Sequence, residues 1–371
     1  MRTKSIVAWL ILVFFSAALL FCGREKEEKK SISESIIGVK IYNADGNFQE
    51  LFEEWQSLGI NTVLASEAVL SNREFRDLAK KSNTTIFIIL PIFHNPQELE
   101  KNPDLYAITD EGKRASDDWV HFVCPTREDY REQRISSIKQ AIEKYQPDGI
   151  SIDFIRYFVF WEKVYPERTS ESLANTCFDT RCLDKFQKET GVEIPQQLVK
   201  VPEKAAWIRE NHLQVWTEWK CSVITSMVKE ISAAAKKSKP DVLVNVHAVP
   251  WREKDFSGAI KIIAGQDISA ISEYTDLISP MCYSHMVKRK PSWIHSVVED
   301  MHNRSRSAVV PSIQVKEAYL ADVLSTEDFR DALYEALKAP SRGVLFWSWE
   351  ALSQDPQKKD VIKALLGHRA S

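Results

Sequence analysis

The chain has 371 residues, of which 44% are hydrophobic and 27% are charged. This length and composition are those of a globular protein with one large domain or two ordinary ones, so the chain can bury a sizeable core. The formal net charge of −3 argues against nucleic acid as a partner, because such binding relies on clustered Lys and Arg that neutralise phosphates.

Residues 1–22 have the pattern of an export signal. A basic start and an apolar run at residues 6–21 precede Cys22 and a charged stretch. The tetrapeptide at residues 19–22 resembles the bacterial lipoprotein box, whose cysteine is lipidated and becomes the mature N-terminus, although Phe21 replaces the usual small residue. An uncleaved signal anchor and an ordinary cleaved signal peptide are the alternatives, since the run is close to the length that spans a bilayer.

Residues 23–35 are rich in Lys and Glu, and we expect them to form a solvated tether because they are too charged to bury a core. Residues 36–371 then form the folded domain. A lipid on Cys22 or a signal anchor would each hold this domain at a membrane, facing outward. We therefore expect an exported, membrane-anchored protein in the bacterial periplasm or at the cell surface.

From residue 36 onward, short β-branched runs alternate with longer helical ones. Eight such repeats predict parallel strands with crossover helices in a (β/α)8 TIM barrel. The predicted strands are residues 36–41, 62–66, 85–92, 149–154, 242–247, 276–282, 308–315 and 343–349. Helical periodicity predicts helices at residues 48–58, 72–81, 128–145 and 205–237.

A doubly wound open sheet is the alternative fold, but no Gly-rich phosphate-binding fingerprint follows the first strand. The long connection after the fourth strand, residues 159–203, is rich in Pro, Thr, Cys and aromatic residues. A loop insertion of this length at the catalytic face of a barrel is more often functional than decorative.

The fourth predicted strand carries the most informative acid. Asp153 lies near its C-terminal end, which faces the active site in proteins built from βα units, and Arg156 and Tyr157 follow directly. The alternative is a structural Asp153 paired with Arg156, because any buried carboxylate needs a partner. Asp148 belongs to the turn that enters the strand, so we expect it to be structural.

Other chemistry-bearing side chains follow the other predicted strands. Aromatic rings and carboxylates dominate, and this mixture fits a carbohydrate partner, because sugar rings lie on flat aromatic faces while charged groups hold their hydroxyls. The histidines among them are as often structural as substrate-binding. The candidates are Tyr42, Glu67, His94, His247, Trp251, Tyr283, His285, Gln314, Lys316, Glu317, Trp349 and Glu350.

Three segments carry a family resemblance. Residues 145–157, Tyr-Gln-Pro-Asp-Gly-Ile-Ser-Ile-Asp-Phe-Ile-Arg-Tyr, resemble the signature of the hypothetical glycosyl hydrolase group, bacterial barrels of the glycoside-hydrolase type. Residues 177–191 with Ile194-Pro195 resemble a Cys…Cys…Phe…Gly…Pro segment of one branch of that group, and residues 276–283 are similar to its Asp-x-φ-Ser-Pro-Met-x-Tyr strand. The resemblance implies the barrel fold.

For Asp153 the resemblance implies the role of the strand-four nucleophile of several α-glycosidase families. Amylase-type enzymes have an Arg two residues before that Asp, where this chain has Ser151, but Arg156 can supply the charge that keeps Asp153 ionised. Glycoside hydrolysis also needs a second, protonated carboxyl group. By strand-end position we rank the candidates Glu350, Glu317 and Glu67; surface salt bridges are the alternative for each.

Five cysteines remain after Cys22. Cys177 and Cys182 flank Phe-Asp-Thr-Arg in a predicted loop and are the best candidates for a disulfide in an oxidising compartment. Zinc would need two more ligands at suitable spacing, and no second Cys or His pair supplies them, so we predict no metal site. No cofactor is predicted.

The sequence thus favours a glycoside hydrolase that cleaves an oligo- or polysaccharide with a carboxylate pair at the C-terminal face of the barrel. The alternative is a catalytically inactive carbohydrate-binding lipoprotein on the same fold. Another hydrolase, such as a deacetylase or esterase, is a third hypothesis, but the chain has no Gly-x-Ser-x-Gly nucleophile elbow.

The lipoprotein hypothesis is tested by Cys22→Ala. We expect the variant to leave the membrane fraction, because lipidation requires the thiol whereas a helical anchor does not. Fractionation of cells expressing the full chain, followed by immunoblotting, measures the change. A variant that stays with the membrane would identify the segment as a signal anchor.

Overall fold

The computed structural model describes residues 35–44 and 46–367 of the chain. The predicted export signal, Cys22 included, and residues 23–34 of the predicted tether lie outside the described residues. Within the described ranges, no helix is both long enough and apolar enough to cross a membrane.

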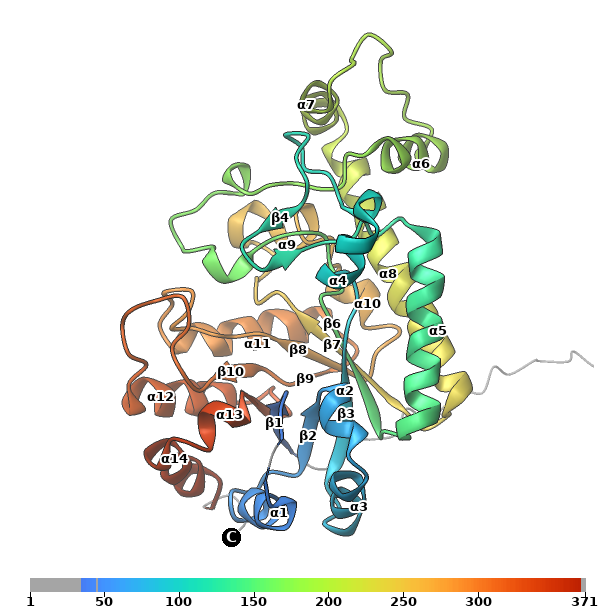
Figure 1. The fold of residues 1–371 in the computed structure, drawn as a ribbon. Helices are drawn as coiled ribbons and strands as arrows, with labels where there is room; N and C mark the ends of the chain where they lie inside the picture. Colours follow the sequence, from blue (N-terminus) through green and yellow to red (C-terminus); the bar gives the residue numbers. More distant parts are fainter. Residues whose placement is uncertain (1–34, 45, 368–371) are drawn as a thin grey trace, which may run out of the picture. The chain divides into compact units, whose positions relative to one another are not determined.

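A nine-stranded sheet of parallel strand pairs forms the centre of the fold (Figure 1). Its order is β10-β11-β1-β2-β3-β6-β7-β8-β9. The strands are β1 (Ile36–Ile41), β2 (Thr62–Ala65), β3 (Thr85–Pro91), β6 (Gly149–Asp153), β7 (Leu243–Ala248), β8 (Leu277–Pro280), β9 (Ala308–Val309), β10 (Ser312–Gln314) and β11 (Gly343–Trp347). A separate antiparallel pair, β4 (Ser116–Asp117) and β5 (Val120–His121), follows β3.

The two outer strands of the sheet, β9 and β10, are consecutive segments of the chain interrupted at Val310 and Pro311. Proline has no N–H and cannot donate to a strand ladder. β9 pairs with β8 and β10 pairs with β11, while Met281, just after β8, pairs in parallel with Ser312 of β10. The sheet therefore curls back towards itself, which makes the fold TIM-barrel-like.

Helices connect the strands and surround the sheet (Figure 1). They are α1 (Phe48–Ser57), α2 (Glu67–Ser71), α3 (Arg73–Lys81), α4 (Pro96–Lys101), α5 (Glu128–Tyr145), α6 (Thr180–Thr190), α7 (Val201–Asn211), α8 (Leu213–Ser238), α9 (Ala259–Ile262), α10 (Ile268–Ile271), α11 (Ser292–Arg304), α12 (Thr326–Ala336), α13 (Trp349–Leu352) and α14 (Pro356–Gly367), with short 3-10 turns η1 (Pro103–Leu105), η2 (Trp161–Lys163), η3 (Ser170–Ser172) and η4 (Asp255–Ser257). In α1, Phe48, Phe52 and Trp55 recur at helical spacing and are all buried, while Asn47 caps the first turn.

Each predicted strand overlaps an observed one, and every residue of β1, β2 and β6 is buried, which explains their continuous apolar runs. Two predictions need correction. The seventh strand is split at Pro311, and the helix predicted at residues 205–237 breaks at His212, whose φ of −141° is not helical. The pair β4–β5 was not predicted, because its strands are too short to show alternation.

The same type of hydrogen bond links neighbouring strands at three places along the amino-terminal edge of the sheet. Asn61, Asp148 and Asp276 each precede a strand and accept the backbone N–H of the second residue of the neighbouring strand. For Asp148 the donor is Ile86 N, at 2.9 Å from Oδ2. The structural role predicted for Asp148 is confirmed.

We expect Asp148→Ala to lower the free energy of unfolding by about 1–3 kcal/mol, because the Ile86 N–H loses its charged acceptor. Asp148→Asn keeps an acceptor oxygen at the same place and should lose less. Urea denaturation measures both, and equal stability of the Ala variant and the wild type would contradict the proposed role of this bond.

Candidate active site

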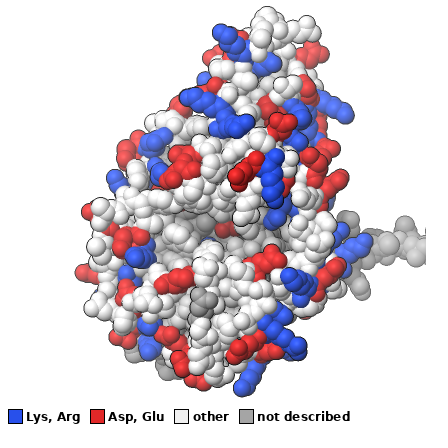
Figure 2. Space-filling view, in the orientation of Figure 1, with Lys and Arg blue, Asp and Glu red and all other residues white. Residues whose placement is uncertain are grey.

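A cleft of about 500 Å³ opens at the carboxyl ends of the strands. Its walls come from β1, β3, β6 and β11 and from the loops that follow the strands. Figure 2 shows a hollow near the centre of the molecule whose visible walls are mainly uncharged side chains. The ionisable side chains that line the cleft are Lys40, Tyr42, His94, Asp153, Arg156, Glu162, Tyr283, Tyr319 and Glu350.

Asp153 is the last residue of β6, and its side chain is buried in the lining of the cleft. Its Oδ1 accepts the Phe154 N–H at 2.7 Å. Phe154 has a φ of +50°, a left-handed conformation that is uncommon outside glycine and occurs often at functional sites. Burial raises the pKa of the Asp153 carboxyl, but the electrostatic effect of the adjacent His247–Lys40 pair, with smaller ones from the Phe154 N–H and Arg156, outweighs it and holds the pKa below its usual range. Asp153 is therefore ionised at neutral pH.

Lys40 is the main cation facing Asp153. Burial lowers the pKa of Lys40 to about 8, and Asp153 opposes that shift. Its Nζ lies 3.4 Å from His247 Nδ1 and 3.3 Å from Tyr283 Oη. Burial also lowers the pKa of His247 to about 3, so this ring is neutral and can accept from Lys40 at Nδ1 while Nε2 donates to Ser151 Oγ at 2.8 Å. Lys40 is left as the charge that stabilises the carboxylate.

Glu162 supplies a second carboxyl to the same cleft. It lies in η2, within the connection that follows β6, and is only 8% exposed. Within the part of the chain that the structure describes, its Oε2 has no hydrogen-bond partner. Burial raises the pKa of Glu162 to about 7, although the Arg156 charge opposes the shift. The cleft thus holds one ionised carboxylate and one carboxyl that keeps its proton up to about pH 7, the arrangement that acid–base catalysis requires.

Arg156 is buried in the wall of the cleft with its guanidinium over the rings of Phe122 and Phe154, at 4.7 and 5.2 Å. None of its three guanidinium nitrogens has a hydrogen-bond partner among the described residues. The predicted pairing with Asp153 is therefore not formed as an ion pair. A buried cation with free N–H groups at a cleft is suited to bind acceptor oxygens of a ligand.

Aromatic rings form the rim and one wall of the cleft. Trp119 and Tyr319, 40% and 41% exposed, meet at the rim, where Trp119 Nε1 donates to Tyr319 Oη at 2.8 Å. Deeper in the cleft Tyr283 stacks on Trp347 with centroids 4.6 Å apart, and Trp161 lies 5.7 Å from Tyr283. Such flat apolar faces next to directed polar groups are suited to sugar rings.

Comparison with known proteins shows which solved structures have a similar fold. No protein-family model matches the sequence, and no curated protein matches it. Among solved structures, the PgaB (BpsB) glycoside hydrolase domain from Bordetella bronchiseptica has a TM-score of 0.65 at 14% identity, covering 89% of this chain and 98% of that one. The chain has a glycoside-hydrolase-like fold.

Two further structures are similar over part of their own length. A β-galactosidase from the psychrophilic Marinomonas ef1 has a TM-score of 0.65 at 10% identity, covering 89% of this chain and 58% of that one. An α-L-fucosidase isoenzyme from Paenibacillus thiaminolyticus has a TM-score of 0.53 at 11% identity, covering 88% of this chain and 48% of that one. At these identities the likeness concerns the fold alone.

Several predicted site residues do line the cleft: His94, Arg156, Tyr283 and Glu350, together with Tyr42 and Asp153. Glu350, which we ranked first as the second carboxyl, accepts two backbone N–H groups through Oε1, from Tyr42 at 2.6 Å and Asn43 at 2.9 Å. These bonds tie Glu350 to the loop after β1. Burial lowers the pKa of His94 to about 4, so its ring is neutral.

The other two predicted carboxyls lie outside the cleft lining. Glu67 is exposed and accepts from Tyr145 Oη at 3.0 Å, and Glu317 Oε2 accepts from Leu324 N at 3.4 Å. The loop that carries Glu317 sends Tyr319 into the cleft instead. Of the three ranked acids only Glu350, ranked first, lines the cleft, because a strand-end position does not fix where a loop side chain points.

Six predicted substrate-binding residues also lie outside the cleft lining and are held by other contacts. Tyr157 is buried with its ring 4.5 Å from Lys220 Nζ, and Gln314 Oε1 accepts from Met286 N at 2.8 Å. Trp349 packs against Trp55 of α1, with centroids 5.5 Å apart. The others are His247, beneath Asp153 in the network with Lys40, Trp251, against Phe256, and His285, which is half-buried.

The predicted Cys177–Cys182 disulfide is not formed in the structure, where all five described cysteines are free thiols. Cys182 instead approaches Cys124, with the two sulfurs 3.1 Å apart. Sequence spacing could not show this neighbour, because Cys124 precedes α5 and β6.

Sequence reasoning missed several residues of the cleft, above all Lys40, Trp119, Trp161, Glu162 and Trp347. Glu162 lies well past the end of β6, so a search at strand ends does not find it. A signal did exist, since an acid directly after the apolar run Tyr-Phe-Val-Phe-Trp has few exposed neighbours. Lys40 was equally visible as the one charge in a strand that is otherwise apolar.

The raised pKa of Glu162 predicts a specific pH dependence of stability. Between pH 4.5, its ordinary pKa, and about 7, the folded state keeps this proton and the unfolded state releases it. The Glu162 proton therefore stabilises the folded state fully below pH 4.5. This stabilisation decreases as the pH rises from 4.5 and is lost above about pH 7. Across this window the free energy of unfolding decreases by roughly 3 kcal/mol.

Urea denaturation of the wild type and of Glu162→Gln at several pH values isolates this term, because glutamine does not titrate. We expect the stability difference between them to change by that amount across the window. Glu317→Gln removes a carboxyl outside the cleft whose pKa is lowered by backbone hydrogen bonds, so it should leave the fall in stability between pH 4.5 and about 7 unchanged. Identical pH dependence of the wild type and the Glu162 variant would contradict the raised pKa.

Proposed function

We propose that this protein is a glycoside hydrolase that cleaves an oligo- or polysaccharide, with Asp153 as the ionised carboxylate and Glu162 as the proton donor. One observation carries the proposal: two buried carboxyls line one cleft, with a lowered pKa for Asp153 and a raised pKa for Glu162. Similarity in fold to glycoside hydrolase structures supports it.

The proposed reaction assigns each carboxyl one role. Glu162 donates its proton to the glycosidic oxygen as the bond to the anomeric carbon breaks, so the leaving sugar departs as an alcohol. Asp153 attacks the anomeric carbon, or removes the proton of the water that does so. Lys40 keeps Asp153 ionised, and the free N–H groups of Arg156 bind an oxygen of the substrate.

The proposal also covers the closure of the barrel and the cellular location of the protein. We infer that the sheet closes as a (β/α)8 barrel and that the connection between β6 and α8 is an insertion that brings Glu162 over the cleft. We also propose that the chain is exported and anchored through a lipid on Cys22, on the strength of its N-terminal sequence.

Kinetics of two variants test the two roles. With substrates whose leaving group is a sugar or an alkyl alcohol, Glu162→Gln should lower kcat by about 10²–10⁴-fold. With aryl glycosides that release an acidic phenol, the loss should be much smaller, because a phenolate leaves without a proton. Asp153→Asn should lose turnover on both substrate classes, because the amide is neither a nucleophile nor a base.

Glu317→Gln is the matched control and should keep wild-type kinetics. The substrates come from a panel of aryl glycosides and bacterial or plant polysaccharides. Full turnover of Glu162→Gln on alkyl glycosides would overturn the assignment of the acid. A wild-type protein that binds oligosaccharides but hydrolyses none would support the catalytically inactive carbohydrate-binding alternative.

A further inference from the structure

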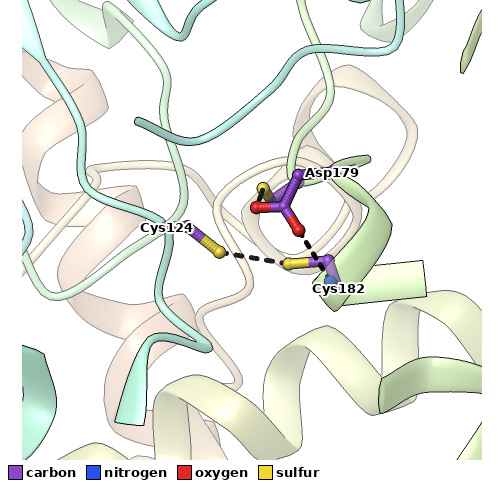
Figure 3. Close-up of side chains that lie close together, drawn as sticks. Cys124, Asp179 and Cys182 are labelled. Atoms are coloured by element: carbon purple, nitrogen blue, oxygen red, sulfur yellow. Dashed lines mark hydrogen bonds between the residues drawn. The ribbon is translucent and has the colours of Figure 1, made fainter. Parts of the chain in front are cut away.

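A second group of chemistry-bearing side chains lies outside the cleft lining. Cys124, Cys177, Asp179 and Cys182 bring one ligand-type atom each to a common point, and these atoms all lie within 4.8 Å of one another. Figure 3 shows Cys124, Asp179 and Cys182 pointing towards one another. The three cysteines are fully buried. Exposed acidic side chains often lie close together by chance, but three of these four residues are cysteines whose thiols are shielded from water.

Two separate parts of the chain build this cluster. Cys124 lies between β5 and α5, whereas Cys177, Asp179 and Cys182 lie in the connection after β6, where Asp179 caps the N-terminus of α6. Asp179 Oδ1 accepts the Cys182 N–H at 2.7 Å, while Oδ2 lies 3.3 Å from Cys177 Sγ. The cap therefore uses one carboxylate oxygen and turns the other towards the sulfurs.

A backbone N–H and a hydroxyl group lie within hydrogen-bonding distance of the sulfurs. Ile108 N donates to Cys177 Sγ at 3.3 Å. Thr126 Oγ1 lies 3.1 Å from Cys124 Sγ and 3.0 Å from Cys182 Sγ. Donors aimed at sulfur stabilise thiolates, the form in which cysteine binds metals.

No described basic side chain forms an ion pair with the carboxylate of this cluster; the salt bridges of residues 35–367 leave Asp179 out. Arg127, whose charge acts on Cys124 and Asp179, directs its guanidinium to Asp129 and to the Asp104 carbonyl oxygen. The buried Lys220 directs its Nζ to Asn175 Oδ1 at 2.5 Å and to the carbonyl oxygens of Ile262 and Ile263 at 2.9 and 3.1 Å. A partly buried carboxylate among thiols needs a counter-charge, and a metal ion provides it.

We propose that Cys124, Cys177, Asp179 and Cys182 bind one Zn²⁺ ion through three thiolates and one carboxylate oxygen. Zinc prefers four ligands of this kind in a tetrahedron, with bonds of about 2.3 Å to sulfur, which places the donor atoms about 3.8 Å apart. Binding displaces the three thiol protons to solvent. The Cys124 and Cys182 sulfurs move apart by about 0.7 Å to reach that spacing.

Four protein ligands complete the shell, so the site is structural. The metal joins the segment before α5 to the connection after β6, and that connection also carries Trp161 and Glu162 into the cleft. The link to catalysis rests on the proposed function, whereas the metal site itself does not. Our sequence analysis predicted no zinc, because Cys124 is remote from the other ligands in the sequence and Asp179 was not counted as one.

Metal analysis of the full chain, purified under reducing conditions without chelator, tests the site. We expect one equivalent of zinc per chain. Replacement of the zinc by Co²⁺ should give an intense thiolate-to-Co²⁺ charge-transfer band and the visible bands of a tetrahedral ion. Cys124→Ser should lower zinc affinity roughly tenfold or more, whereas Cys221→Ser, at a buried thiol outside the cluster, should keep the full equivalent.

The Co²⁺ spectrum of the wild type decides the question even if Cys124→Ser fails to fold. A folded wild-type protein that binds neither Zn²⁺ nor Co²⁺ would overturn the site, and so would unreduced peptide maps showing two of the three cysteines joined in a disulfide. Failure of the proposed hydrolase activity in a protein that holds its zinc would count against the function and leave the site intact.

Discussion

A carboxylate buried at the end of a parallel strand is the constraint on which this site depends. Taking Asp153 out of water is costly unless charge and hydrogen bonds compensate, and the inside of the sheet is built to do so. Lys40 faces the acid, and His247 holds Lys40 and Ser151. Asn245 extends this polar layer, donating to Ser151 Oγ at 3.0 Å and accepting from Ser279 Oγ. Buried strand residues such as Lys40, His247 and Asn245 therefore form the polar network that keeps Asp153 ionised.

The chain gives its two carboxyls opposite environments. Asp153 stays ionised because fixed charges outweigh its burial, whereas Glu162 is held by a loop in apolar surroundings where burial outweighs the Arg156 charge. Glu350 lies in the same cleft but is engaged by two backbone amides. The difference between acid and base therefore arises from position, since the chemical groups are the same.

The connection after β6 lies between two buried polar centres. Its consecutive residues Arg156 and Tyr157 illustrate this: Arg156 lines the cleft, while the ring of Tyr157 packs against Lys220. Farther along, the same connection supplies Glu162 to the cleft and three of the four members of the cysteine cluster. The part of this connection between β6 and α6 contains the short turns η2 and η3, so it needs fixed points at both ends to hold a catalytic side chain in place.

The sequence by itself determined the alternation of strands and helices, because periodicity is a local property, and with it the position of Asp153 at a strand end and the structural role of Asp148 in the turn before that strand. It also indicated an aromatic, acidic site. Only the tertiary structure decided which groups keep Asp153 ionised: Arg156 lies three residues away in the sequence, but His247 of β7 and Lys40 of β1 have the larger electrostatic effect on its pKa. It likewise brought in Glu162, and it joined Cys124 to Cys182. Loop direction and contacts between distant segments depend on packing in three dimensions, and no spacing along the chain encodes them.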